Sequence, residues 1–192
     1  MGSIVLKAPA KVNLYLDVLK KRPDGYHDIE TIFERIALFD TIIIKNSPDK
    51  KIRVTSDHPG LPLGRDNLVY KAAEAIFKKA GLKVGVCVDI KKRIPVAAGL
   101  AGGSSDAASM LIGINRLFRL GLSKAQLAGL ARAIGADVAF FLYDCSFAIG
   151  TGRGDQIKPL PINDASIWHI IIPFNFGISA HSAYNGISRN LR

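Results

Sequence analysis

Hydrophobic and polar residues alternate in several short stretches of the chain, with the period expected of β-strands. Four apolar residues from Val12 to Val18 alternate with polar or aromatic ones, which predicts a half-buried strand. The turn sequence RPDGY follows, and a return strand from about Ile29 would complete a hairpin. Similar patterns predict strands at Leu38 to Lys45, Ile52 to Ser56, Val84 to Ile90 and Ile167 to Pro173.

Three other stretches have the 3.6-residue spacing of amphipathic helices. Residues 67–80 and 123–134 each have a capping residue in front, Asn67 or Ser123, and a glycine behind. The third stretch has apolar residues on one side at Ala107, Leu111, Ile114 and Phe118. Its helix is expected to start near Ser104 or Ser105, because serine is a good N-cap residue. Strands come first and helices interleave later, so the predicted fold class is α+β with a largely mixed or antiparallel sheet.

The segment before the third helix, IPVAAGLAGGSS at residues 94–105, consists almost entirely of small residues. Its bare backbone lets amide groups turn inward, and the helix N-terminus adds free N–H groups and the positive end of the helix dipole. The alternative is a flexible loop before a core helix. The two serines and the length of the run favour a phosphate site, although neither a Walker A loop nor a dinucleotide fingerprint is present.

The composition is that of a globular protein with an unusual positive charge. The 192 residues suit one large domain, or one domain and part of another, and 48% are hydrophobic. The net charge of +10 favours an anionic partner, which can be a nucleic acid, a membrane surface or a phosphorylated small molecule. Much of this charge lies in clusters at residues 20–22, 50–51 and 91–93, which we expect to be solvated surface at turns.

The chain shows no pattern of export or membrane insertion, so we expect a cytoplasmic protein. The longest uncharged stretch, residues 165–188, is interrupted by Pro173 and Gly177, and Lys7 comes too early for a signal peptide. Cys87 and Cys145 lie in apolar contexts without metal-like spacing and are expected to be buried free thiols.

Five motifs, in order along the chain, resemble those of the GHMP kinases. They are PAKVNLYLDV at 9–18, RPDGYHDIETIF at 22–33, DNLVYKAA at 66–73, the small-residue loop and GADVAFFL at 135–142. The first two are similar to those of the diphosphocytidyl-methylerythritol kinases of the non-mevalonate isoprenoid pathway. The resemblance implies an N-terminal ATP-binding domain at 1–155, related in fold to a ribosomal protein domain. Residues 156–192 would then be the start of a truncated α/β C-terminal domain.

The same resemblance implies phosphoryl transfer from ATP, with Mg²⁺, to the 2-hydroxyl group of a cytidine diphosphate sugar alcohol. Asp137, embedded between apolar residues, would take or orient the hydroxyl proton, and Lys11 would keep that acid ionised. Without the resemblance, Asp137 can equally cap a turn after Gly135, and Lys11 can be a solvated strand residue.

The loop pattern of the family is matched by Pro95, Gly99, Leu100, Ser104 and Ser105, and the implied ATP site also includes Ala101, Gly102, Gly103 and Asn67. Ser104 or Ser105 is the candidate hydroxyl for a phosphate or for Mg²⁺. Ala101 stands where many relatives have glycine, and alanine is tolerated there if its φ is negative. Asn67 would meet the adenine ring, or would simply cap the helix that follows it.

A cytosine ring needs an aromatic face and edge hydrogen bonds, and Tyr26 and His27 offer both directly after a tight turn. Tyr184 is the candidate for an opposing aromatic wall, and Asn13 shares a strand face with Lys11 near the erythritol part. Each of these residues, taken alone, is more often an ordinary surface or half-buried group.

Two alternatives remain at this point: another GHMP small-molecule kinase, and a basic nucleic-acid-binding α+β module, which the fold alone does not exclude. GLAGGSS before a helix and a carboxylate in a cationic site favour the kinase. We therefore expect small-molecule substrates, no nucleic-acid or membrane partner, and a monomer or homodimer.

Overall fold

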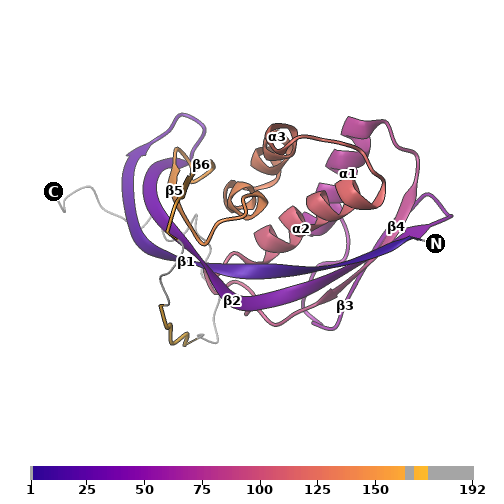
Figure 1. The fold of residues 1–192 in the computed structure, drawn as a ribbon, viewed down its shortest axis with the longest axis horizontal. Coiled ribbons are helices and arrows are strands. Elements are labelled where there is room, and N and C mark those ends of the chain that lie inside the picture. Colours follow the sequence, from indigo (N-terminus) through magenta and orange to yellow (C-terminus); the bar gives the residue numbers. More distant parts are fainter. Residues whose placement is uncertain (1, 163–166, 173–192) are drawn as a thin grey trace.

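The computed structural model describes residues 2–162 and 167–172, which form a sheet with helices packed on one of its faces (Figure 1). The strands are β1 (Ser3–Lys21), β2 (His27–Ser47), β3 (Ile52–Ser56), β4 (Gly85–Lys91), β5 (Phe147–Thr151) and β6 (Gln156–Leu160). The helices are α1 (Leu68–Ala80), α2 (Gly102–Leu117), α3 (Lys124–Ile134) and the 3₁₀ helix η1 (Ala136–Leu142).

The long strand β2 organises the sheet, whose order is β3-β4-β2-β5-β6, with β1 also paired to β2. Residues 41–47 of β2 pair with β4, and residues 31–34 pair with β5. The β3–β4 pair is parallel and the other described pairs are antiparallel, so the predicted α+β class with a mixed sheet is confirmed. The two strands expected from Ile29 and at Leu38 to Lys45 are one continuous strand.

The predicted alternation in β1 is wrong at its centre. The β1–β2 register shifts between Asn13 and Tyr15, which leaves Leu14 as the extra residue of a β-bulge. Because a bulge breaks the period of two, Leu14 and Leu16 are 45% and 40% exposed instead of buried. The hairpin itself is confirmed, although β2 begins two residues before Ile29.

The core lies between the sheet and the helices, and α2 packs directly on β2. A Cβ atom at Gly113 would lie 2.4 Å from Cδ1 of Ile44, so glycine permits this close approach. The predicted apolar face of α2 is confirmed, because Ala107, Leu111 and Ile114 are fully buried. Helices α1 and α3 are also confirmed, with Asn67 and Ser123 as their N-caps.

The region after β5 differs from its prediction. Strand β6 pairs with β5 and extends the sheet past residue 155 to Leu160. Residues 167–172 form no strand: His169 contacts Glu34 of β2 at 2.8 Å, and Ile171 packs against the apolar cluster around Leu100. This segment is therefore anchored by side chains, and most of its apolar surface stays exposed.

The cysteines are free, as predicted, but half-buried instead of buried. Cys87 lies between Val86 and Val88 on β4, and those valines face the helices, so Cys87 faces the other side of the sheet. Among the described residues, no helix is long and apolar enough to cross a membrane.

Candidate active site

A cavity of about 800 Å³ lies between the β1–β2 hairpin, the loop before α2 and the start of η1. This volume is in the range of small-molecule and cofactor sites. Most of the residues predicted for the site line it: Lys11, Asn13, Tyr26, His27, Asp137, Pro95 and Gly99 to Ser104. Segments that are far apart in sequence therefore meet at one place.

Lys11 on β1 is the buried cation of this cavity. Its side chain is only 7% exposed, so the alternative of a solvated strand residue is wrong. The ammonium group lies 3.9 Å from Oδ2 of Asp137 and donates a hydrogen bond to Oδ1 of Asn13 at 2.5 Å. It also lies 5.5 Å from the ring centroid of Phe33, within reach of a cation–π contact.

Asp137 lies in the first turn of η1 and faces the cavity. Its neighbours Val138 and Ala139 are buried, but its own side chain is 35% exposed, so the expected embedding between apolar residues is wrong. A short 3₁₀ helix buries one side and turns the other outward, which leaves the carboxylate accessible beside Lys11.

Asn13 is held by a chain of hydrogen bonds at the bulge of β1. Its amide donates to Oγ1 of Thr31 at 2.6 Å, and that hydroxyl donates to the carbonyl oxygen of Tyr15 at 2.7 Å. The Lys11 amide donates to the carbonyl oxygen of Leu100 at 3.1 Å, so β1 is also tied to the loop. These contacts fix where the Lys11 ammonium lies relative to the loop.

The loop before α2 contains three residues with positive φ: Ala97 at 57°, Gly99 at 76° and Ala101 at 54°. The negative φ on which alanine at position 101 depended is therefore not observed. Ala101 is in the left-handed conformation as the N-cap residue of α2, which costs an alanine about 1 kcal/mol or more. The N-cap residues of α1 and α3 are extended, so the left-handed conformation is particular to the loop that lines the cavity.

Helix α2 starts earlier than predicted, at Gly102, so Ser104 and Ser105 lie in its first turn and neither is the N-cap. The Ser105 amide already bonds the Ala101 carbonyl at 3.0 Å, which closes that turn. Ser104 lines the cavity, whereas Ser105 is fully buried and its hydroxyl has no partner among the described residues. Of the two candidate hydroxyl groups, Ser104 is therefore the one at the cavity.

A buried cluster beneath the loop was not predicted. The Lys92 ammonium, with its side chain 4% exposed, contacts the carboxylates of Asp40 and Asp106, the latter at 3.0 Å. The expectation that residues 91–93 are solvated is thus wrong for Lys92. Burial raises the pKa of Asp106 to about 7 despite the nearby Lys92, and Asp106 Oδ1 has no partner in the described chain. The sequence signal for this cluster was the Asp106 carboxylate next to Ala107, on the apolar side of the predicted helix.

The predicted site residue Asn67 caps a helix. Asn67 is buried as the N-cap of α1: it accepts from the Val69 amide at 2.8 Å and donates to the Pro62 carbonyl oxygen at 2.6 Å. It is not among the described residues that line the cavity, and its helix-capping alternative is the one observed. Tyr184 lies outside the described residues.

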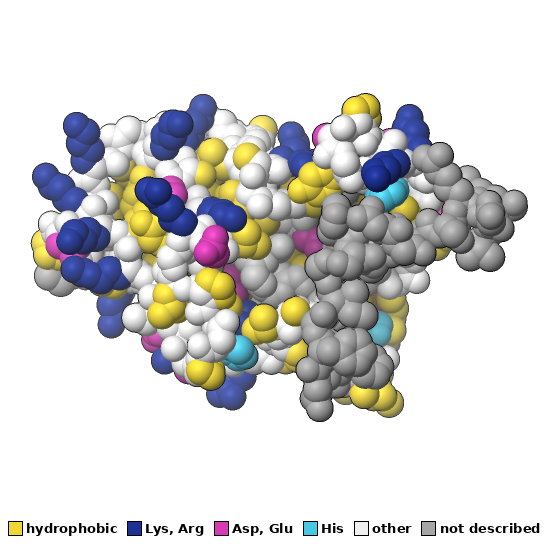
Figure 2. All heavy atoms as spheres, turned by 180° about the vertical axis from the view of Figure 1, so that it is seen from behind, with side chains coloured by type: hydrophobic (Ala, Val, Ile, Leu, Met, Phe, Trp, Pro, Cys, Tyr) yellow, Lys and Arg dark blue, Asp and Glu magenta, His cyan; other side chains and the backbone are white. Residues whose placement is uncertain are grey.

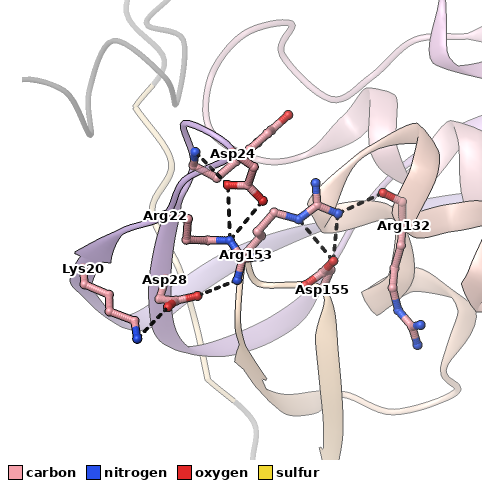
Figure 3. Close-up of polar contacts among 8 residues, drawn as sticks. Lys20, Arg22, Asp24, Asp28, Arg132, Arg153 and Asp155 are labelled. Carbon is pink, nitrogen blue, oxygen red and sulfur yellow. Dashed lines mark hydrogen bonds and ion pairs between the residues drawn. The ribbon is translucent and has the colours of Figure 1, made fainter.

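Tyr26 and His27 follow the hairpin turn and line the cavity. Tyr26 is 55% exposed, and the Arg153 guanidinium lies 5.0 Å from its ring centroid. Figure 3 shows the arginine and aspartate side chains around this turn.

Basic side chains are spread over the face of the molecule in Figure 2, between hydrophobic and uncharged ones. On the described part of that face they form no continuous basic stripe of the kind that tracks a nucleic-acid backbone.

Comparisons with known proteins agree with this site. A family model for the GHMP kinases N terminal domain matches residues 67–145, which include the loop and Asp137. The chain is 44% identical over 189 residues to the 4-diphosphocytidyl-2-C-methyl-D-erythritol kinase of Geobacter metallireducens, covering 97% of this chain and 66% of that protein. The chain belongs to the GHMP kinase family. GHMP kinases use ATP, so the phosphate-binding interpretation of the loop agrees with the family.

Further GHMP kinases support the assignment. A 4-diphosphocytidyl-2-C-methyl-D-erythritol kinase of Bacillus cereus is also 44% identical, with 97% of this chain and 64% of that protein covered. A crystal structure of 4-(cytidine 5'-diphospho)-2C-methyl-D-erythritol kinase superposes with a TM-score of 0.69 at 39% identity, over 83% of this chain and 56% of the other. The chain thus spans about two thirds of the length of the curated relatives it matches.

Proposed function

We propose that the protein is an ATP-dependent kinase that phosphorylates the 2-hydroxyl group of 4-diphosphocytidyl-2-C-methyl-D-erythritol, a step of non-mevalonate isoprenoid precursor synthesis. The observation that carries the proposal is the Lys11–Asp137 pair, 3.9 Å apart, in one cavity with the loop before α2. The names of relatives at 44% identity supply the substrate.

The loop and the start of α2 hold the phosphates of ATP in this proposal. The free amide groups of the first helical turn and the helix dipole attract anions, and Gly102 and Gly103 let a phosphate approach the backbone. The Ser104 hydroxyl is an oxygen donor of the kind that Mg²⁺ prefers, and this ion usually keeps waters and phosphate oxygens as its other ligands. When bound, Mg²⁺ neutralises charge on the β- and γ-phosphates.

Asp137 and Lys11 serve the reacting groups. The substrate hydroxyl oxygen attacks the γ-phosphorus, its proton passes to the Asp137 carboxylate, and the bond between the γ-phosphorus and the leaving oxygen of ADP breaks. Lys11, held by Asn13, lies beside the Asp137 carboxylate and offsets negative charge on the transferring group. Both residues chiefly position reactants and charges, which is what phosphoryl transfer requires.

In this proposal the cytidine part of the substrate binds at the hairpin turn. The Tyr26 ring offers a stacking face at the cavity, and His27 lies beside it for hydrogen bonds to the base edge. Asn13 lies next to Lys11 and contacts the erythritol part. A nucleic-acid-binding role is less well supported, because the described part of the face in Figure 2 has no continuous basic stripe along which a nucleic-acid backbone could lie.

The test is the variant Asp137→Asn, which keeps the shape of the side chain but cannot accept the proton. We expect turnover to fall by about 10² to 10⁴-fold while Mg-ATP affinity stays nearly unchanged. Phosphate transfer to the diphosphocytidyl substrate is compared with transfer to mevalonate and homoserine. Turnover within about tenfold of the parent removes Asp137 from the mechanism, and a preference for mevalonate or homoserine makes the protein another GHMP kinase.

A further inference from the structure

Two turns form the wall of the cavity where the cytidine part is proposed to bind. One is the hairpin turn between β1 and β2, which carries Tyr26, and the other is the β5–β6 turn, which carries Arg153. A backbone hydrogen bond from the Ile29 amide to the Gly152 carbonyl oxygen, 2.7 Å long, joins them. The position of one turn is therefore coupled to that of the other.

The hairpin turn itself is held by charged side chains. Arg22 donates to Asp24 at 3.1 Å and to Asp28 at 2.8 Å, and Asp24 Oδ1 accepts from the Tyr26 amide at 3.1 Å. These contacts fix the backbone of Tyr26. They leave its ring free to rotate, since the residue is 55% exposed.

Arg153 supplies the contact to the ring. Its guanidinium lies 5.0 Å from the Tyr26 centroid, within the range of a cation–π interaction. Arg153 is itself fixed: Nε and Nη2 donate to Oδ2 of the buried Asp155 at 3.3 and 2.9 Å, and Nη2 donates to the Arg132 carbonyl oxygen at 3.0 Å (Figure 3).

We propose that Arg153 is a positioning residue, which holds the Tyr26 ring in the orientation that stacks on the pyrimidine of the substrate. This inference rests on the proposed function. A ring that is fixed before binding loses less rotational freedom when the base arrives, so the substrate binds more tightly. Direct binding of a substrate phosphate by Arg153 is less favoured, because Asp155 already compensates its charge through two charge-assisted hydrogen bonds to Oδ2.

The experiment measures the affinity for cytidine 5'-diphosphate by calorimetry, and the kinetic constants for the diphosphocytidyl substrate. The variants are Arg153→Gln, Arg153→Lys, Tyr26→Leu and the double variant Arg153→Gln with Tyr26→Leu. Arg132→Gln is the matched control. Arg132 and Arg153 both line a small pocket beside the hairpin turn, but the Arg132 guanidinium points away from Arg153 (Figure 3), and the variant keeps the carbonyl acceptor.

Arg153→Gln is expected to weaken binding of cytidine 5'-diphosphate and to raise KM for the diphosphocytidyl substrate by about two- to fivefold. The turnover number and KM for ATP should stay within twofold of the parent. Arg153→Lys should give an intermediate affinity, because lysine keeps the cation but not both hydrogen bonds to Asp155. In the Tyr26→Leu background, Arg153→Gln should have no further effect. Arg132→Gln should behave as the parent does.

An effect of Arg153→Gln that persists in the Tyr26→Leu background overturns the inference, because Arg153 would then act without the ring. If the parent binds cytidine 5'-diphosphate and Arg153→Gln binds it equally tightly, the inference is also overturned, but the proposed function stays intact. A parent that neither binds this nucleotide nor phosphorylates the diphosphocytidyl substrate overturns the proposed function instead.

Discussion

The buried Lys92 cluster gives the largest expected effect on stability. In Lys92→Met the carbon stem is approximately kept, but the ammonium between two carboxylates is lost. Asp40 is 0% exposed and Asp106 is 1% exposed, so water does not replace the missing cation. Removal of one partner from a buried ion pair typically costs about 3 to 5 kcal/mol, and we expect a loss of unfolding free energy in this range at pH 8.

The two carboxylates should respond differently, which makes the loss depend on pH. Asp40 Oδ1 still accepts hydrogen bonds from the amides of Arg93 and Ile94, at 2.5 and 2.9 Å. Asp106 retains an oxygen that has no partner in the described chain, so it takes up a proton when Lys92 is absent. Protonation is easier at low pH, and the loss at pH 5 should therefore be smaller than at pH 8.

Urea denaturation followed by circular dichroism at pH 5 and pH 8 measures both quantities. Lys91→Met is the control, because Lys91 is next in sequence but its side chain is 48% exposed and pairs with Asp89 at the surface. That variant should lose about 1 kcal/mol or less. A loss below about 1 kcal/mol for Lys92→Met at pH 8, or an equal loss at both pH values, would refute the reasoning.

Three further predictions concern the cavity and the helix beneath it. Lys11→Ala should lower kcat by about 10²-fold or more in steady-state assays, since charge stabilisation at a transferring group is worth roughly 3 kcal/mol; a higher KM with unchanged kcat would make Lys11 a binding residue. Gly103→Val should weaken Mg-ATP binding in calorimetry by about two orders of magnitude. Its Cβ would meet only Leu68, at 3.8 Å, so folding should be retained, and Gly129→Val on α3 is the control. Near-parental ATP affinity in the folded Gly103→Val protein would reject the phosphate-binding loop. Burial raises the pKa of Asp106 to about 7, above its unfolded value of 3.8, so the stability that it contributes is present below about pH 4 and is lost as the pH rises towards 7. Asp106→Asn should flatten that part of the stability curve, and an unchanged curve would contradict the raised pKa.

Local patterns predicted most elements because their causes are local. Helix α1 follows from the Asn67 cap, the apolar spacing and Gly81, whose φ of 64° suits glycine. The continuity of β2 was not predictable in this way. Glu34 and Arg35 interrupt its apolar pattern, but Glu34 contacts His169 and Arg35 donates to the Tyr143 carbonyl oxygen. These partners accommodate the two polar side chains within the strand. Because they are more than 100 residues away, the local pattern does not show them.

In the site too, features with local causes were predictable and features that depend on distant contacts were not. The small-residue loop was recognisable because bare backbone before a helix has a direct physical use. Lys92 was assigned to the surface because a run of three basic residues is usually solvated. Its two carboxylate partners come from β2 and α2, and only the packing of α2 on the sheet brings them to the same ammonium. The carboxylate beside Ala107 indicates burial, but the sequence does not identify Lys92 as its partner.

Strand β1 explains how the acid and the phosphate loop come to share one cavity. The amide of Lys11 bonds the Leu100 carbonyl oxygen, and its ammonium lies 3.9 Å from Asp137, so one residue joins the loop to η1. The bulge at Leu14 comes directly after Asn13, whose side chain bonds both Lys11 and Thr31. A regular strand would keep the alternation that the sequence suggests, with Leu14 packed on the core side. Lys11 is held in the cavity by the bond of its amide to Leu100, by Asn13 and by the nearby Asp137, while the bulge directly beyond Asn13 takes Leu14 out of the predicted alternation.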